Sequence, residues 1–276
     1  MLTLLLFAGF LQAQDKKESF SFTLKEAIDH AIQNNYSAIN ANRDIEAAKQ
    51  KKWETTTIGL PQIDGSVSYQ NAFKLQRQVI GFGGTPVELV MGEYNTMDSK
   101  ISLNQLIFDG SYLVGLQSAK TYLKISENAK IKTNQEIKEI VINSYGNVLL
   151  ADESILILQK NKAILEKTFS DTKEIYKNGL IEEENVEQLQ ITLASINSSL
   201  ENVKRQKTIA NDMLKLVLGI DLQNDLTLTD KLDVLTQNNV DLVLLKEEFN
   251  VNNNIDYQIG QNLLTSKELL LKLEKS

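Results

Sequence analysis

The chain has 276 residues, of which 42% are hydrophobic and 24% charged, with a formal net charge of −7 and no cysteine. This length and composition suit one or two globular domains or a β-barrel membrane protein. Nucleic acid is excluded as a partner, because no basic stripe with interleaved aromatic residues is present to neutralise phosphates. Without cysteine there are no disulfides and no lipid-attached N-terminal cysteine, so any attachment to a membrane would depend on the folded body.

Residues 1–14 are predicted to form a signal peptide. The apolar run from Leu2 to Leu11 has the length of a signal-peptide core, and small and polar residues offer a cleavage site near Ala13 or Gln14. The run is shorter than the roughly 20 residues of a transmembrane helix. Because the usual basic residues are absent before it, we expect the true start to lie upstream of Met1. The alternative is a buried N-terminal helix.

A first helix is predicted from residue 22 to residue 57. Thr23 and Glu26 have the spacing of a capping box, and an apolar stripe with helical spacing follows them. The pair Asn34-Asn35 interrupts this stripe, which then resumes. His30, the only histidine, has no second candidate ligand, so we interpret it as a helix-surface residue and expect no metal site.

Two strands are predicted at about residues 62–73 and 97–108, after Pro61 ends the helical pattern. Both alternate apolar and polar residues, and both reach the length of about 9 to 11 residues that a tilted membrane strand needs. The connection between them contains Gly81-Phe82-Gly83-Gly84 and Pro86 and is predicted to be a long loop. It lacks the Gly-Lys-Ser/Thr of a nucleotide-binding loop.

Two long helices are predicted next, at about residues 112–177 and 184–218. The first has no proline and would be roughly 100 Å long. Gly179 is expected to end it in a left-handed conformation, and Glu182-Glu183-Glu184 favours a new helix start. In the second helix, apolar residues recur at spacings of three and four, with only Lys207 out of character, which predicts an antiparallel coiled-coil hairpin. An ordinary helix bundle is the alternative, disfavoured by the helix lengths. The seam of the second helix consists of Val186, Leu189, Leu193, Ile196, Leu200, Val203, Ala210, Leu214 and Val217.

Short elements are expected at residues 220–249, and a second repeat is expected to start in residues 250–276. The pair Asn253-Asn254 aligns with Asn34-Asn35, and helix-like residues follow both pairs. Residues 15–249 would then be one complete repeat. Because the sequence stops within a helical pattern, we expect it to be a fragment with a truncated second repeat.

Four motifs stand in a fixed order along the chain. They are Leu24-Lys25-Glu26-Ala27-Ile28 followed by Asn34-Asn35, Leu60-Pro61-Gln62-Ile63, Ser102-Leu103-Asn104-Gln105-Leu106-Ile107-Phe108-Asp109-Gly110, and Tyr176-Lys177-Asn178-Gly179-Leu180. With these motifs the chain resembles the TolC-type outer-membrane efflux protein family. The resemblance extends from Thr23 to Asp221 and is carried by the order and spacing of the motifs more than by any one of them.

This resemblance implies a homotrimer in which each protomer gives four strands to an outer-membrane barrel and long helices to a periplasmic tunnel. Its implied partners are outer-membrane lipid, a periplasmic adaptor protein and an inner-membrane pump. The helix-tip turn that would contact the adaptor maps onto Asn178, Gly179, Leu180 and Ile181. On the strands, the polar faces would line the water-filled lumen and the apolar faces would meet lipid. The lumen residues would be Asp64, Ser66, Ser68, Gln70, Asp98, Lys100, Ser102 and Asn104. The lipid-facing residues would be Ile63, Val67, Tyr69, Phe73, Ile101, Leu103 and Ile107.

The sequence therefore predicts a mainly α-helical fold, in which a long antiparallel coiled-coil hairpin is joined to a β-hairpin of an oligomeric transmembrane β-barrel. The expected function is passive export through the channel of a tripartite efflux or type I secretion system, without catalytic residues or cofactors. The alternative is a periplasmic coiled-coil protein with a structural or adaptor role. An enzyme is disfavoured, because one histidine, no cysteine and scattered carboxylates offer no catalytic cluster. The cargo class, whether drug, metal ion or protein, is left open by the residues of the tunnel wall.

Overall fold

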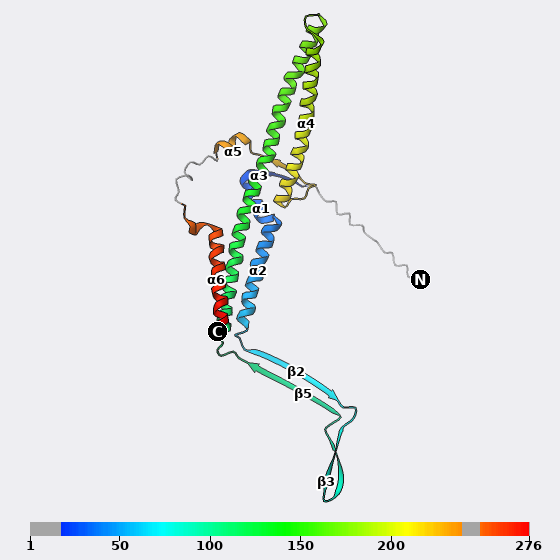
Figure 1. Ribbon diagram of the computed structural model, residues 1–276, viewed down its shortest axis with the longest axis vertical. Coiled ribbons are helices and arrows are strands. Elements are labelled where there is room, and N and C mark those ends of the chain that lie inside the picture. Colours follow the sequence, from blue (N-terminus) through cyan, green and yellow to red (C-terminus); the bar gives the residue numbers. More distant parts are fainter. Residues whose placement is uncertain (1–17, 239–248, 276) are drawn as a thin grey trace, which may run out of the picture. The chain divides into compact units, whose positions relative to one another are not determined.

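The computed structural model describes residues 18–238 and 249–275 (Figure 1). The predicted signal peptide and part of the segment 220–249 therefore lie outside the described residues. The chain divides into two compact units, one of residues 1–45 and 126–260 and the other of residues 46–125 and 261–276. The elements are β1 (Ser19–Phe22), α1 (Leu24–Asn34), α2 (Tyr36–Thr57), β2 (Gln62–Asn71), β3 (Gln76–Phe82), β4 (Thr85–Met91), β5 (Asn95–Asn104), α3 (Gly110–Lys177), α4 (Glu183–Leu218), β6 (Asp225–Leu228), α5 (Leu232–Asn238), the 3-10 helix η2 (Val251–Asn253) and α6 (Ile255–Lys275).

The prediction of a single helix over residues 22–57 is wrong. Strand β1 ends at Phe22, and two helices, α1 and α2, follow it. The capping box exists as predicted: the Glu26 amide donates to Thr23 Oγ1 and the Thr23 amide donates to Glu26 Oε2. The break falls at Asn35, whose extended backbone ends α1. Its Oδ1 accepts from the amide of Ser37 in the first turn of α2, and its Nδ2 donates to the carbonyl of Val217 at 2.7 Å. One asparagine thus ends one helix, caps the next and holds both to α4.

The first unit has its core where α1, α3, α4 and a small parallel sheet of β1 and β6 meet. The fully buried side chains that α1 gives to this core are small, Ala27 and Ala31, so that its backbone can lie close to α4. Close approach is required at Gly219 as well, since a Cβ there would lie 2.4 Å from the carbonyl oxygen of Asn34. The fully buried large side chains are Val141, Tyr145, Leu214 and Leu218.

A hydrogen-bonded group joins this core to the strand β1 and to the start of α1. Tyr145 Oη donates to the carboxylate of Asp230 at 3.0 Å, and the same carboxylate oxygen accepts from the amide of Leu24 at 2.7 Å. Tyr145 Oη also lies 3.1 Å from the carbonyl oxygen of Phe22. Burial raises the pKa of Tyr145 well above its ordinary value, so the phenol keeps the proton that it shares with Asp230.

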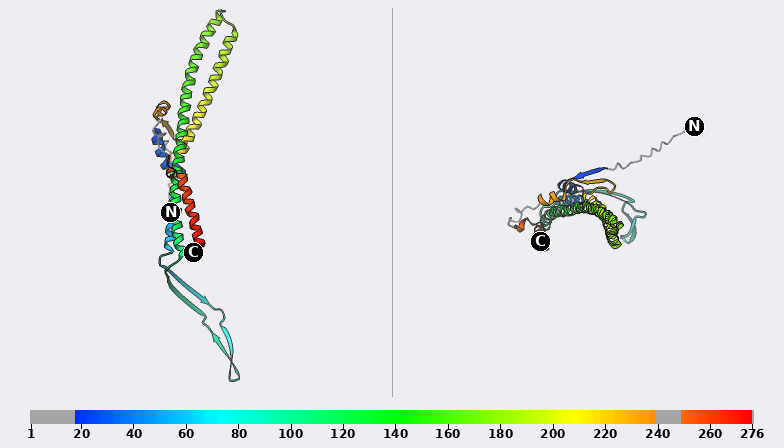
Figure 2. Two further views of the ribbon diagram at one scale, coloured as in Figure 1. Left: turned by 60° about the vertical axis from the view of Figure 1, so that its left-hand side comes forward. Right: turned by 90° about the horizontal axis from the view of Figure 1, so that it is seen from above.

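The helices α3 and α4 form a long antiparallel hairpin, which Figures 1 and 2 show in green and yellow-green. Residues 126–177 of α3 and all of α4 belong to the first unit. All nine predicted seam positions of α4 are buried or half-buried, from Val186 to Val217. Lys207, the exception in the pattern, forms an ion pair with Asp152 of α3. The charge at this seam position is therefore matched by an opposite charge on the facing helix.

The second unit contains two antiparallel ribbons, one of β2 with β5 and one of β3 with β4. The predicted long loop is wrong, because residues 76–91 form the β3–β4 ribbon. Gly83 and Gly84, both with positive φ (61° and 92°), make the two-residue turn between its strands. Two consecutive residues with positive φ match the twist of the strands on either side, and glycine adopts them without a steric penalty.

The helix α6 begins in the same way as α2. Asn254 Oδ1 accepts from the amides of Asp256 and Tyr257, as Asn35 Oδ1 accepts from that of Ser37. These are the asparagines that the proposed internal repeat aligns, and the two helices have 21 and 22 residues. Lys132 of α3 forms a salt bridge of 2.6 Å with Asp256, which raises the pKa of the lysine.

Candidate functional site

The β2–β5 ribbon carries the pattern that the sequence singled out, and its register keeps the two faces in phase. Residues directly opposite in an antiparallel pair point to the same side. Ile63 pairs with Leu103, Gly65 with Ile101 and Tyr69 with Met97, whereas Asp64 pairs with Ser102, Ser66 with Lys100 and Ser68 with Asp98. A slip of one residue would mix the two classes on each face. The register therefore brings the predicted lumen residues together on one face and the predicted apolar residues within the strands together on the other.

The apolar face of this ribbon is exposed in the described chain, and Ile101 is 84% accessible. The strands are shorter than predicted, since β2 ends at Asn71 and β5 at Asn104. Phe73 and Ile107, both predicted to lie on strands, are therefore in the segments beyond them. They remain almost fully exposed, at 98% and 95%.

The turn that links α2 to β2 is closely packed against the start of α3. A Cβ on Gly59 would lie 2.3 Å from Tyr112 Oη, so a larger residue there would displace the Tyr112 side chain. Tyr112 Oη donates to the carbonyl of Thr56 at 3.2 Å, and the Tyr112 amide donates to Asp109 Oδ1 at 2.9 Å. Asp109 thus caps α3 while Tyr112 holds the end of α2 against it.

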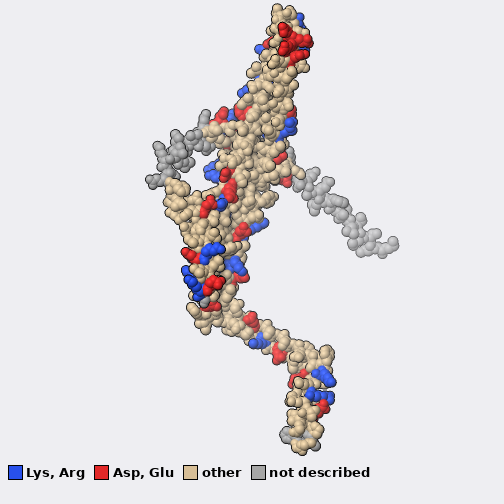
Figure 3. Space-filling model, in the orientation of Figure 1, with Lys and Arg blue, Asp and Glu red and all other residues tan. Residues whose placement is uncertain are grey.

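The helix tip is the turn between α3 and α4, where all four predicted tip residues lie. The Gly179 amide donates to the Tyr176 carbonyl and the Leu180 amide to the Ile175 carbonyl, with Gly179 at φ 74°. This is the Schellman arrangement, which needs a left-handed residue after the helix. Leu180, which follows it, is 75% exposed. Glu182, Glu183 and Glu184 follow this turn in the sequence and are exposed. Figure 3 shows an acidic patch in red near the tip.

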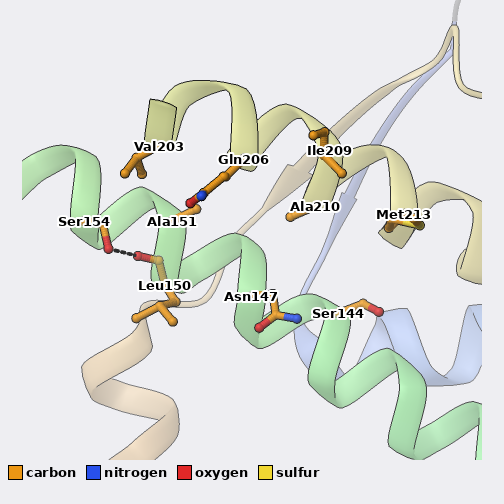
Figure 4. A pocket seen from close by; sticks show the side chains of 10 residues that line it. All are labelled: Ser144, Asn147, Leu150, Ala151, Ser154, Val203, Gln206, Ile209, Ala210 and Met213. Carbon is orange, nitrogen blue, oxygen red and sulfur yellow. Dashed lines mark hydrogen bonds between the residues drawn. The ribbon is translucent and has the colours of Figure 1, made fainter. Parts of the chain in front are cut away.

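A groove of about 450 Å³ runs between α3 and α4 near the base of the hairpin (Figure 4). Ser144, Asn147 and Ser154 line it from α3, and Gln206, Ile209 and Met213 from α4. The groove is open and mostly apolar, and no titratable side chain lines it. Val203 and Ala210 of the predicted seam also line this groove, but most of its members lie outside the seam and carry no motif of their own, so the sequence did not predict it.

Within residues 18–238 and 249–275, no group of three or more His, Cys, Asp or Glu side chains is placed to hold a metal ion. His30 lies in an aromatic contact, with its ring centroid 5.0 Å from that of Phe22. Partial burial lowers its pKa. His30 is therefore part of the packing between α1 and β1.

One helix among the described residues, α3, is long and apolar enough to cross a membrane on length and composition alone, with a stretch of mean hydropathy 1.2. A core helix passes the same test. Since α3 supplies Ile137, Val141 and Tyr145 to the core, we interpret it as a helix of the folded body.

Comparison with protein families gives a match over residues 27–220 to the family described as outer membrane efflux protein. These residues include most of α1, all of α2 to α4, both ribbons and the helix tip. A search of curated proteins gives no match.

Several solved structures share the fold. The CmeC outer-membrane channel of Campylobacter jejuni is 19% identical, with a TM-score of 0.66 over 91% of this chain and 52% of its own. The outer membrane protein VceC of Vibrio cholerae is 16% identical, with a TM-score of 0.57 over 72% and 47%. The open-state MtrE outer membrane channel of Neisseria gonorrhoeae is 15% identical, with a TM-score of 0.55 over 71% and 42%. The chain thus spans about half the length of these proteins, and the predicted mainly helical fold with a long hairpin and few strands is confirmed.

Proposed function

Because the chain belongs to the outer membrane efflux protein family, we propose that it forms one protomer's part of the channel in a tripartite efflux or type I secretion system. Membership of this family localises the chain to the outer membrane, with its helices extending into the periplasm. The proposed role is passive conduction through a trimeric pore and includes no catalytic step.

The observation that supports this proposal best is the two-faced β2–β5 ribbon. Ten consecutive pairs keep Ile63, Ile101 and Leu103 on one side and Asp64, Lys100 and Ser102 on the other. A ribbon with one apolar and one polar face suits a wall between lipid and water. In a protein surrounded by water, such an exposed apolar face would be a liability for aggregation.

The edges of the same ribbon favour an oligomer. Within the described residues, β2 and β5 pair only with each other, so the outer edge of each strand leaves its backbone donors and acceptors without strand partners. In hydrocarbon each such group costs several kcal/mol, as an order of magnitude, and only a closed barrel pairs them all. Strands of neighbouring protomers would supply these partners.

The long hairpin of α3 and α4 would form the tunnel wall below the barrel. Its tip, with Leu180 exposed beside the acidic patch, is the surface we assign to the periplasmic adaptor. An apolar anchor with charged neighbours is typical of the centre and rim of a protein interface. The groove of Figure 4 would receive side chains of a neighbouring tunnel helix.

Membrane fractionation combined with conductance measurement tests this function. We expect the protein in the outer-membrane fraction and extractable only by detergent, and we expect the purified protein to give an ohmic conductance in planar bilayers. A protein that proved freely soluble in the periplasm would contradict the proposal. That result would favour the second candidate, a periplasmic coiled-coil protein, which uses the α3–α4 hairpin but not the apolar face of the ribbon.

A further inference from the structure

Two short segments join the helices of the second unit to its ribbon, and together they form what we call the junction: residues 57–63 and residues 105–109. Charged residues are absent from a longer stretch around each connection, from residue 55 to 63 and from residue 101 to 108. Charges resume at once on either side, with Glu54 before the first stretch and Asp109 after the second. The two uncharged stretches thus coincide with the change from helix to strand and with the change from strand back to helix.

Four large apolar side chains of the junction are exposed and lie outside regular structure. They are Ile58, Leu60, Ile107 and Phe108, the last of which is 81% accessible. None of these four belongs to β2 or β5, so the alternation of the strands does not account for them. An exposed cluster of large apolar side chains marks a surface that meets something other than water.

Two glutamine side chains hydrogen-bond to backbone carbonyls of the junction. Gln62 Nε2 donates to the carbonyls of Thr57 at 2.7 Å and Leu60 at 3.0 Å. Gln105 Nε2 donates to the carbonyls of Gly59 at 3.0 Å and Leu106 at 2.9 Å. Two side-chain amide groups therefore bond four carbonyls, of which that of Thr57 also accepts from the backbone amide of Leu60.

These bonds matter most where water is scarce. In bulk water these carbonyls would accept hydrogen bonds from water molecules, whereas near hydrocarbon a carbonyl must be paired within the protein. Ten residues of β2 or β5 at about 3.3 Å each, tilted by about 45°, rise about 23 Å, close to the apolar band of about 25 Å in such barrels. The junction then falls just beyond that band, in the headgroup region, where aromatic and apolar side chains anchor membrane proteins.

We propose that the junction is a lipid-binding anchor. Four apolar side chains insert into the periplasmic leaflet, those of Ile58, Leu60, Ile107 and Phe108. The side-chain amides of Gln62 and Gln105 hydrogen-bond to the backbone carbonyls of the same segments. The partner is the acyl and headgroup boundary of phospholipid. This inference rests on the proposed function, because it assumes that β2 and β5 cross the membrane. It adds that the protein binds lipid at the periplasmic ends of these strands.

Spin labels on single cysteines test the anchor, because the chain has no cysteine of its own. The labelled variants are Phe108→Cys in the junction, Ile101→Cys on the apolar face of β5 and Lys120→Cys on exposed α3, each reconstituted in phosphatidylethanolamine and phosphatidylglycerol vesicles. Collision with oxygen, which partitions into lipid, is compared with collision with a nickel chelate, which stays in water. We expect the oxygen-to-nickel ratio at Phe108 to lie between those at Ile101 and Lys120, several-fold above the latter.

The three positions separate the two hypotheses. A lipid-like ratio at Ile101 with a water-like ratio at Phe108 would overturn the anchor and leave the channel proposal standing. Water-like ratios at both would overturn the membrane placement itself. Low collision with both reagents at Phe108 would mean that another protein surface covers it, which also overturns the anchor.

Removing the amides tests their role. We expect Gln62→Leu combined with Gln105→Leu to lower the yield of membrane-inserted protein several-fold, while the matched control Gln70→Leu, on the polar face of β2, leaves the yield near that of the parent. In detergent the parent and the double variant should retain the same helical circular dichroism, which shows that the variant folds. An unchanged yield for the double variant would overturn the role of the glutamines.

Discussion

A single arginine on the apolar face of β5 is expected to prevent assembly, and its effect should depend on depth and on face. The middle of β5 lies between Ser99 and Lys100. At about 3.3 Å per residue and a tilt of about 45°, Ile101 then lies only about 4 Å from the membrane midplane and Leu103 about 8 Å. An arginine facing lipid costs about 2 to 4 kcal/mol at the midplane and less toward the interfaces. Ile101→Arg should therefore disfavour the inserted protein by a factor of about 30 to 1,000, and Leu103→Arg by less.

The control is Ser102→Arg, which places the same charge between those two positions but on the polar face, opposite Asp64. It should cost little, because that face is predicted to line water. The assay is the yield of heat-modifiable trimer on semi-native gels, combined with urea unfolding in lipid vesicles. If Ser102→Arg were as harmful as Ile101→Arg, or if Leu103→Arg were the worst of the three, the assignment of faces or of depth would be refuted.

Three further predictions concern other parts of the chain. At the tip, Gly179→Pro or Leu180→Asp should abolish pump-dependent export while leaving membrane insertion intact, and normal export by both variants in a transport assay would contradict the docking role. At the junction, Gly59→Ala should lower the midpoint of thermal unfolding because its Cβ meets Tyr112; Tyr112→Ala should remove most of the further loss in the double variant, whereas purely additive losses would contradict the clash. In the first unit, the pKa of His30 is lowered by burial, so the unfolded chain binds the proton more tightly and stability should fall as pH decreases through about 6.5. The variant His30→Gln should flatten this decrease in urea unfolding between pH 7.5 and 5.5, and an unchanged slope would contradict it.

Much of the fold could be predicted because its signals are local. The capping box at Thr23 and Glu26, the left-handed Gly179 and the alternation of β2 and β5 each depend on residues a few positions apart. The α4 seam could also be predicted, because apolar residues spaced by three and four lie on one side of a helix whatever packs against it.

The features that the sequence did not reveal depend on distant partners. Asn35 ends α1 partly because its side chain reaches Val217, 182 positions away. Lys207 broke the seam pattern on its own helix, and only the facing Asp152 accounts for it. No local pattern identifies such partners.

The β3–β4 ribbon is a different case, because its signal was present. Gly83-Gly84 between runs of alternating residues is a hairpin signal, but Pro86 and the nearby glycines favoured a loop. In the structure Pro86 belongs to β4 and lies opposite Gly81 of β3. Within the described residues β4 has one strand neighbour, so a proline there need not interrupt a second ladder.

Thiol labelling along β5 tests the central claim most directly, that this ribbon is a wall between lipid and water. Single cysteines at each position from Met97 to Leu103 would be exposed, in membranes, to a membrane-impermeant maleimide. The account predicts that positions 98, 100 and 102 react quickly and that positions 97, 101 and 103 are protected. Uniform reactivity along the strand, or protection at the even positions, would contradict it.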